Sequence, residues 1–461
     1  MVRFLLGLSF LTVLACSQKH GECPSVFFGG EIVNPTSDYV VLYRNDTYID
    51  SVKLNDNNRF SFNLQGIEEG LYHFDHSPEL QYVYLQEGDS LLIRLNTMEF
   101  DESLVFSGKG SEINNFLVEM FLAYEEEEPL IYSYYKLKPD AFKAKIDSLR
   151  TQKIKHLEEL IVEDGQLSKK VVSMAMASID YNSYIYSEKY PFYHKKKTGE
   201  ETIHELTDNF YDYRKMVDLN SRDLTYFRPY YDYMKYHFGN LSYMACMEDC
   251  SNGKMSMASH LHFNKHKLHL VDSLVKDEDL RNLLFRNIAM DYLLKEHNPN
   301  KECQIFIDKF RKLSTSASHK EEITHLYEGI QNLQPNRTLP NLWVKDINNE
   351  SHSLRDISKN EKTVFYFWAG SQKRHFKNIT RHINKLKKKH PDLNFVGINV
   401  RTSHPQWLSM MEENQLDKSS QFYGEDFKEI QTTMIIDGLN KCVIAKDTLI
   451  VDAFANLYYS F

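Results

Sequence analysis

The sequence predicts a multidomain α+β protein, in which an N-terminal antiparallel β-sandwich, a central α-helical domain and a C-terminal α/β domain follow one another. Three observations support this prediction. At 461 residues the chain exceeds the size at which one hydrophobic core stops growing. The spacing of apolar residues changes from that of strands to that of helices near residue 109, and near residue 335 strands and helices begin to alternate. With 42% hydrophobic and 26% charged residues, the composition excludes global disorder.

The charge and the aromatic content of the chain indicate which kinds of surface and core to expect. The chain carries 55 basic and 64 acidic residues, a net charge of -9, which argues against a nucleic-acid surface spread over the whole protein. The 29 Tyr and 28 Phe predict cores built largely from rings. We therefore expect no nucleic-acid partner, and no motif leads us to expect a cofactor.

The N-terminus predicts export. Residues 1–15 combine a positive Arg3 with the apolar run FLLGLSFLTVL, which has the length of a signal-peptide core and is too short to span a bilayer. Val13-Leu14-Ala15-Cys16 resembles the lipobox of bacterial lipoproteins, which implies that Cys16 is lipidated and that residues 16–23 form a tether. We expect a lipid-anchored protein of the cell envelope, at the outer membrane and facing the periplasm.

Residues 24–108 alternate polar and apolar side chains in short runs such as RFSFNL and SLLIRL, separated by turn residues. Such runs predict an antiparallel β-sandwich. With RFSFNL, Gly70-Leu71-Tyr72, Gly88-Asp89-Ser90 and SGKGSEINNFL, the segment resembles the small β domain of unknown function that precedes thioredoxin-like domains in envelope lipoproteins of Gram-negative anaerobes. The resemblance implies no catalytic role.

Residues 109–334 have helical periodicity and predict an α-helical domain of about eight to ten helices. The stretch YNSYIYSEKYPFYHKK is interpreted as a rigid helical core, with the lining of a groove as the alternative. The four glutamates at 125–128 are interpreted as a solvated helix end.

Two features of the helical segment are candidate sites. On a regular helix the Cβ atoms of Cys246 and Cys250 would lie about 5–6 Å apart, so a disulfide between them needs a helix end or a loop. His262, His266 and His269 share one face of a predicted helix at spacings compatible with a divalent metal. Because no fourth ligand can be named, a solvated or aromatic-packed histidine face is preferred and no metal is assigned.

Residues 335–461 predict an α/β domain. KTVFYFWAG is apolar without alternation, which is typical of a buried strand, and LNFVGINV is a second such strand. The helix between them carries an apolar stripe of Phe376, Ile379, Ile383 and Leu386. Strand, helix and strand over this length form one right-handed βαβ unit. A short helix over QWLSMMEENQL and a hairpin around Asp447-Thr448 complete the domain.

This last segment resembles the thioredoxin-like family of periplasmic thiol-disulfide oxidoreductases and peroxiredoxin relatives. The resemblance rests on Leu339-Pro340, VFYFWAG, FVGINV and KDTLIVDAFA, in which Thr448 takes the family's glycine position. Active members follow the first strand with W-C-x-x-C. Here Gln372 stands in place of the nucleophilic cysteine and His375 in place of the resolving cysteine. The family's cis-proline position falls on Asn440, where we expect a trans peptide or a rebuilt loop.

These replacements favour a redox-inactive function. A thiolate at a helix N-terminus is stabilised by unpaired backbone N–H groups, and glutamine has no comparable nucleophilicity. The sequence therefore predicts a scaffold or binding protein for a protein, peptide or glycan, with Gln372, His375 and Asn440 as vacated redox-site positions and no catalytic residue. The apolar sequence around Cys442 predicts an inert thiol.

Three alternatives stay open. The first is a thiol-disulfide oxidoreductase of the envelope that uses other cysteines, such as Cys246 and Cys250. The second is an anion-binding corner formed by Gln372, Arg374 and His375 at the start of a helix. The third is carriage of a metal or haem by the histidine face.

Overall fold

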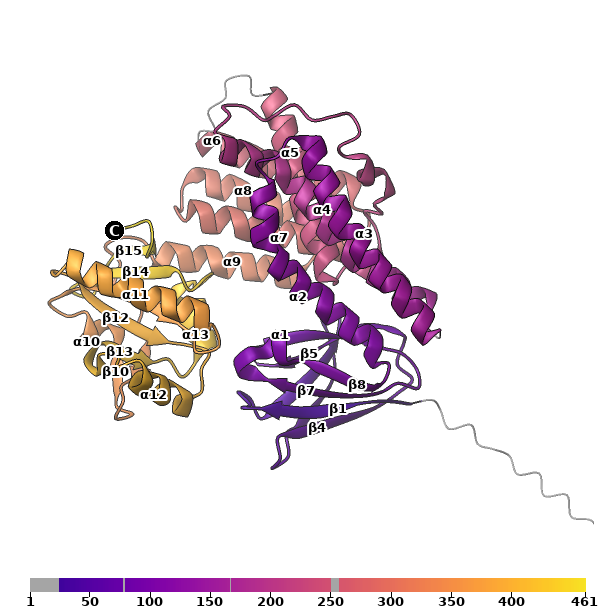
Figure 1. Cartoon of the computed structure of the whole chain (residues 1–461). Coiled ribbons are helices and arrows are strands. Elements are labelled where there is room, and N and C mark those ends of the chain that lie inside the picture. Colours follow the sequence, from indigo (N-terminus) through magenta and orange to yellow (C-terminus); the bar gives the residue numbers. More distant parts are fainter. Residues whose placement is uncertain (1–24, 78, 166, 250–256) are drawn as a thin grey trace, which may run out of the picture.

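The computed structural model describes residues 25–77, 79–165, 167–249 and 257–461, and shows a mixed α+β protein with several sheets and many helices (Figure 1). The predicted signal peptide, Cys16, the tether and Cys250 lie outside the described residues. No helix in the described ranges is both long and apolar enough to cross a membrane.

Eight strands near the N-terminus form two four-stranded sheets, ordered β4-β1-β7-β8 and β3-β2-β5-β6. Inward side chains from both sheets, such as Phe28, Phe62 and Phe74, share one buried core. A short helix, α1 (Phe100–Ser103), and a 3-10 turn, η1 (Thr97–Glu99), follow β7. The strands are β1 (Ser25–Val33), β2 (Tyr39–Arg44), β3 (Thr47–Lys53), β4 (Arg59–Gln65), β5 (Gly70–His76), β6 (Glu79–Leu85), β7 (Ser90–Asn96) and β8 (Val105–Lys109).

The expectation of antiparallel pairing is wrong at one place, because β1 and β7 run parallel, with Phe28 opposite Leu91. Between β1 and β7 the chain forms the strands of the second sheet. No hairpin therefore connects β1 directly to β7, and the two strands need not run in opposite directions. Their close pairing requires a glycine on β1. A Cβ atom on Gly30 would lie 2.3 Å from the Ile93 carbonyl oxygen.

The middle of the chain is helical and packs rings of tyrosine and phenylalanine at its centre. Tyr181, Tyr184 and Tyr233, for example, contact one another on α4 and α5. Two 3-10 turns, η2 (Asp212–Met216) and η3 (Arg222–Leu224), join these helices. The helices are α2 (Ser111–Tyr134), α3 (Pro139–Asp164), α4 (Lys169–Thr198), α5 (Arg228–Asp249), α6 (Met257–Leu274), α7 (Glu278–Glu296), α8 (Lys301–Leu313) and α9 (Ala317–Asn332).

The interpretation of residues 125–128 as a helix end is wrong, although Glu125, Glu126 and Glu128 are exposed, as expected of a solvated run. Helix α2 continues through them, and through Pro129, as far as Tyr134. Glu127 is paired rather than solvated: Lys153 Nζ on α3 donates to Glu127 Oε2 at 2.6 Å, and both side chains are at most 20% exposed. The ion pair holds α2 and α3 together at this point.

The C-terminal part contains a seven-stranded sheet, ordered β10-β9-β13-β12-β11-β14-β15. Strand β11 pairs parallel with β12 and antiparallel with β14, and β14 pairs antiparallel with β15, as expected for a βαβ unit closed by a hairpin. The strands are β9 (Trp343–Lys345), β10 (Ser351–Ser353), β11 (Lys362–Trp368), β12 (Asn394–Asn399), β13 (Gln421–Tyr423), β14 (Lys441–Lys446) and β15 (Leu449–Asn456). The helices are α10 (Leu354–Ile357), α11 (Lys373–Lys389), α12 (His404–Glu413) and α13 (Phe427–Met434), with a 3-10 turn η4 (Lys418–Ser420).

Helices cover both faces of this sheet. The predicted stripe of α11, from Phe376 to Leu386, is buried with Trp368 of β11 and Trp407 of α12 on one face. On the other face, Phe365 and Phe367 belong to a core that includes residues of α13 and α9 and continues into the helical domain. Figure 1 shows α9 between the helical domain and the C-terminal sheet.

Candidate functional site

The end of β11 leads into the segment where the sequence predicts vacated redox-site positions. Trp368 is buried, and its Nε1 donates to Gln421 Oε1 at 3.0 Å. The Gly370 N–H donates to Thr402 Oγ1 at 2.8 Å, which fixes the turn after the strand. Helix α11 then begins at Lys373, and the preceding Gln372 makes no side-chain cap. The first N–H groups of α11 thus lie beside an exposed glutamine.

Two of the three predicted positions meet. His375 Nε2 lies 3.2 Å from Asn440 Oδ1, so an imidazole–amide hydrogen bond joins the first turn of α11 to the start of β14. Burial lowers the pKa of His375, and the hydrogen bond to Asn440 opposes this shift. The correspondence of these positions to a redox pair and a proline stays a prediction.

The residue after Asn440 shows how the loop is rebuilt. Lys441 is buried, and its Nζ donates to the carbonyl oxygens of Met434 at 2.8 Å and Ile435 at 2.6 Å. These are carbonyl groups at the C-terminus of α13, where a cation is favourable. Burial lowers the pKa of Lys441 to about 8. A lysine cap on α13 thus holds the segment that follows Asn440.

The start of α11 lines an open cleft of about 770 Å³, and the opposite wall comes from the N-terminal β domain. Residues 371–375 and 378 form one wall, and residues 79 and 97–102, on β6, η1 and α1, form the other. A salt bridge links the walls: Lys373 Nζ lies 2.7 Å from Glu99 Oε1. Met98 Sδ also contacts Gln406 Nε2. The cleft therefore lies between two parts of the chain that are far apart in sequence.

The two walls carry opposite charges. Lys373 and Arg374 lie on one wall, and Glu79, Glu99, Asp101 and Glu102 lie on the other. Hydrogen bonding to Lys373 lowers the pKa of Glu99. Burial, followed by repulsion from neighbouring glutamates, raises the pKa of Asp101 to about 6, and burial raises that of Glu79. The carboxylates of the acidic wall therefore repel one another, and a bound cationic group would reduce this repulsion.

A second hollow, of about 420 Å³, lies further along α11. Arg381, His382 and Lys385 line it together with Asn378, Asn440 and Tyr458. His382 is oriented by a hydrogen bond to the Leu457 carbonyl at 2.8 Å and by stacking on Tyr458. Because Asn378 also lines the large cleft, the basic side of α11 is common to both.

The other predicted sites do not form comparable arrangements. Cys246 lies on α5 with its Sγ 3.9 Å from His266 Nδ1. His262 and His269 are exposed on α6, and the metal-ligand clusters within the described residues do not include the predicted histidine face. Cys442 is buried in β14, and burial raises its pKa to about 12. This agrees with the expectation of an inert thiol.

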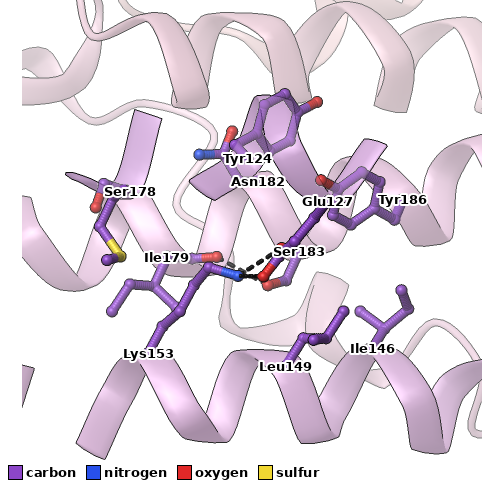
Figure 2. A pocket seen from close by; sticks show the side chains of 11 residues that line it. Tyr124, Glu127, Ile146, Leu149, Lys153, Ser178, Ile179, Asn182, Ser183 and Tyr186 are labelled. Carbon is purple, nitrogen blue, oxygen red and sulfur yellow. Dashed lines mark hydrogen bonds and ion pairs between the residues drawn. The ribbon is translucent and has the colours of Figure 1, made fainter. Parts of the chain in front are cut away.

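An enclosed cavity in the helical domain is too small for a ligand. It has a volume of about 10 Å³, room for roughly one water molecule. Figure 2 shows Lys153 and Glu127 pointing toward one another inside it, next to Tyr124 and Tyr186. The cavity lies where α2, α3 and α4 meet.

Sequence reasoning singled out His375 and Asn440, which the structure brings together, but missed the acidic wall. Glu99 and Lys373 are 274 residues apart, and nothing in either segment signals the other. The concentration of acid at Glu99, Asp101 and Glu102 was the available signal, although exposed acidic residues are common.

No protein-family model and no curated protein sequence matches the chain. Several solved structures do. The thioredoxin domain of a thiol-disulfide oxidoreductase from Bacteroides vulgatus is 19% identical, with a TM-score of 0.22, over 26% of this chain and 87% of that one. A thiol:disulfide interchange protein from Bacteroides sp. is 18% identical, with a TM-score of 0.23, over 26% and 81% of the two chains. A thioredoxin-like protein from Bacteroides caccae is 12% identical, with a TM-score of 0.32, over 59% and 90%.

Similarity at this level carries no argument about activity. The strand order of the C-terminal part indicates its fold: β12 and β15 flank the β11–β14 pair, and β11 leads into α11. By that order this part of the chain is thioredoxin-like in fold.

Proposed function

We propose that this chain is a redox-inactive, thioredoxin-like protein of the cell envelope that binds a partner in the cleft between α11 and residues 97–102. One observation carries the proposal: at the place of the redox pair stand Gln372 and His375, and His375 is hydrogen-bonded to Asn440. Neither side chain can form or break a disulfide. Since Cys442 is buried in the sheet, the described residues offer no substitute thiol at the cleft.

The charges of the cleft indicate the chemistry of the partner. One wall attracts carboxylates and the other attracts ammonium or guanidinium groups, so a ligand that contacts both walls should carry both kinds of charge. A polypeptide segment with mixed charge meets this requirement better than a neutral glycan does. On binding, its charged groups would form ion pairs with Lys373 and Glu99 in place of the pair that these two residues form with each other.

A reduction assay tests the redox part of the proposal. The full-length chain in detergent is added to insulin and dithiothreitol, and precipitation of the reduced insulin B chain is followed. We expect the rate of the control without protein. A clear acceleration that thiol alkylation abolishes would overturn the proposal.

A gain-of-function variant makes a negative result informative. Gln372→Cys combined with His375→Cys places a C-x-x-C pair at the N-terminus of α11, where a thiolate is stabilised. We expect this variant to accelerate insulin reduction, and Asn440→Pro to increase the effect further. Activity in the double variant and none in the parent would locate the defect in the side chains rather than in the fold.

Photo-crosslinking tests the binding part. A photoreactive amino acid is introduced at Gln372, and in a matched control at Val162, which is 83% exposed on α3 and outside the cleft. We expect defined cross-linked products in cells from position 372 and none from position 162. Identical patterns from the two positions would argue against the cleft as the binding site.

The anchor is also part of the proposal. The lipobox-like stretch supports lipidation at Cys16 and attachment to the outer membrane on its periplasmic side. Cys16→Ser should move the protein from the detergent phase to the aqueous phase in a detergent phase partition. Unchanged partitioning would contradict the anchor without affecting the cleft.

A second candidate function rests on a different contact. Cys246 Sγ lies 3.9 Å from His266 Nδ1, and a thiol–imidazole pair of this kind activates a nucleophilic cysteine once the closer contact of that nitrogen with Ser242 Oγ, at 3.2 Å, is broken. The alternative is therefore thiol-disulfide exchange centred on α5 and α6. Loss of a measured reductase activity in Cys246→Ser, with activity retained in Cys442→Ser, would favour it.

A further inference from the structure

Three potential metal ligands meet at the C-terminal end of α4, far from the cleft described above. His194 lies in the last turns of α4, and Glu200 and His204 lie in the segment that follows it. His204 Nδ1 is 3.1 Å from Glu200 Oε1, and His194 Nε2 is 3.4 Å from the same oxygen. All three ligand atoms lie within 4.8 Å of one another.

The hydrogen bonding of His194 leaves a gap that a cation would fill. His194 Nδ1 is 2.7 Å from the Tyr135 carbonyl oxygen. A carbonyl only accepts hydrogen bonds, so Nδ1 carries the hydrogen and Nε2 of the neutral ring presents its lone pair. That lone pair faces a carboxylate oxygen, which is also an acceptor. Two acceptors at this distance repel each other unless a proton or a metal ion lies between them.

The surroundings fix the first ligand and leave the others accessible. The His194 side chain is only 3% exposed and is stacked on Tyr190. A metal-binding histidine typically has its second nitrogen held in this way, by a backbone carbonyl. The side chains of Glu200 and His204 are 34% and 32% exposed, so an ion can enter from solvent.

The spacing of the ligand atoms fits a tetrahedral ion. Bonds of about 2.0–2.1 Å at tetrahedral angles place neighbouring ligand atoms about 3.3–3.4 Å apart. The distance from His194 Nε2 to Glu200 Oε1, 3.4 Å, lies within this range, and the distance from His204 Nδ1 to the same oxygen, 3.1 Å, lies slightly below it. Two imidazoles and one carboxylate suit Zn²⁺ and similar transition metals, whereas Mg²⁺ and Ca²⁺ prefer oxygen ligands throughout.

We propose that His194, Glu200 and His204 bind one Zn²⁺ ion or a similar divalent transition metal, with the fourth position open to water or to a ligand from outside. The ion joins the end of α4 to the segment after it. The ion is also connected to the end of α2, because the carbonyl that His194 contacts belongs to Tyr135, the C-cap residue of that helix. This site is independent of the cleft and of the histidine face on α6.

The test uses the untagged full-length chain, stripped of metal with a chelator and titrated with Zn²⁺ by calorimetry. We expect one ion per chain, a rise in Tm on loading, and with Co²⁺ the visible absorption bands of a four-coordinate ion. Because His194 is buried and its loss could unfold the helix, the variants are Glu200→Gln and His204→Ala. Each should weaken Zn²⁺ binding by more than the roughly 10- to 100-fold that an outer-shell partner contributes.

A matched control separates this site from other histidines. His262→Ala combined with His269→Ala removes two exposed histidines of α6 and should leave Zn²⁺ affinity unchanged. Circular dichroism of each metal-free variant verifies that the fold is intact. No zinc uptake by the parent chain, or uptake that survives both Glu200→Gln and His204→Ala, would overturn the proposal.

Discussion

Thr448 has a backbone conformation that suits glycine better than a β-branched residue. It lies between β14 and β15 with a φ of 69°, directly after Asp447 with a φ of 48°. A left-handed conformation is strained by roughly 1–2 kcal/mol for residues other than glycine. A two-residue hairpin turn with both φ angles positive favours Asp-Gly. We expect Thr448→Gly to raise the free energy of unfolding by about 1 kcal/mol, measured by urea denaturation.

Asn349 provides the control for this prediction. It has a similar φ of 64° in the turn before β10, but asparagine tolerates that conformation better than threonine does. Asn349→Gly should therefore change stability by only a few tenths of a kcal/mol, roughly. A loss of stability in Thr448→Gly would show that the threonine side chain makes contacts that outweigh the strain.

Asp101 gives the acidic wall a pH dependence. Its Oδ1 accepts a hydrogen bond from Gln81 Nε2 at 3.0 Å, and burial raises its pKa from 3.8 to about 6. The folded state therefore binds more protons than the unfolded state between these two values, so this residue lowers stability as pH rises through that window. Asp101→Asn keeps the hydrogen bond and removes the charge. We expect the variant to have the higher Tm at pH 7.5 and little advantage at pH 4. An equal difference in Tm at both pH values would contradict this account.

At the scale of elements, a buried ion pair holds α4 to η2 and α5. Glu188 is 1% exposed, and its Oε1 accepts from Arg214 Nε at 2.9 Å and lies 2.8 Å from His237 Nδ1. Burial alone would raise the pKa of Glu188, but the hydrogen bonds from His237 and Arg214 lower it. The pair therefore stabilises the fold above the usual carboxylate pKa, and this stability is lost as pH falls through the lowered value.

Removing one partner should be costly because the other remains buried with its charge. We expect Arg214→Met to destabilise the protein by about 3–5 kcal/mol. Arg150→Met is the control, because the Arg150–Asp180 pair is 30% and 21% exposed and should contribute about 1 kcal/mol or less. Urea denaturation of both variants decides the point. Equal effects would mean that burial does not set the strength of these pairs.

Elements with strong periodicity could be predicted from the sequence, and those defined by tertiary contacts could not. The stripe from Phe376 to Leu386 predicted α11, and apolar runs predicted β11 and β12. The acidic run at 125–128 looked like a helix end because its pairing with Lys153 on α3 is invisible in local sequence. Helix α13 went unpredicted. Strand β13 also went unpredicted, because it spans only Gln421–Tyr423 and takes its register from β12.

The same reason limited prediction of the site. Gln372 and His375 could be proposed as vacated positions because the strand before them is characteristic, and Asn440 because it precedes the closing hairpin. The cluster of His194, Glu200 and His204 could not be ranked above other histidines, because its geometry depends on how the chain turns after α4 and on the carbonyl of Tyr135. Sequence spacing alone favoured the face on α6, where His266 Nδ1 contacts the side chain of Ser242.

At the scale of the whole molecule, the helical and C-terminal parts share a continuous core. Ile330 of α9, Ile435 after α13 and Phe365 of β11 are buried in it together. His297 stacks on Phe454 of β15 at 4.8 Å between ring centroids. A fragment cut near residue 334 would expose this surface. Functional tests should therefore use the full chain.

The β domain and the C-terminal domain meet at the cleft through exposed charges, and this makes their contact sensitive to salt. Lys373 and Glu99 are 53% and 58% exposed, so water and salt screen the attraction between them. We expect Lys373→Glu or Glu99→Lys alone to increase hydrogen exchange of backbone amides at residues 97–103, and the two changes together to restore it. About 1 M NaCl, which shortens the screening length to roughly 3 Å, should have the effect of a single variant on the parent.

Arg59→Glu is the matched control for this cycle, because it disrupts an exposed ion pair with Glu31 that lies within the β domain. It should leave the exchange at residues 97–103 unchanged. If the two single cleft variants also leave it unchanged, the walls of the cleft are held by apolar contacts rather than by charge. In that case a ligand need not break the Lys373–Glu99 pair to enter, and a partner of mixed charge has no advantage over a neutral one.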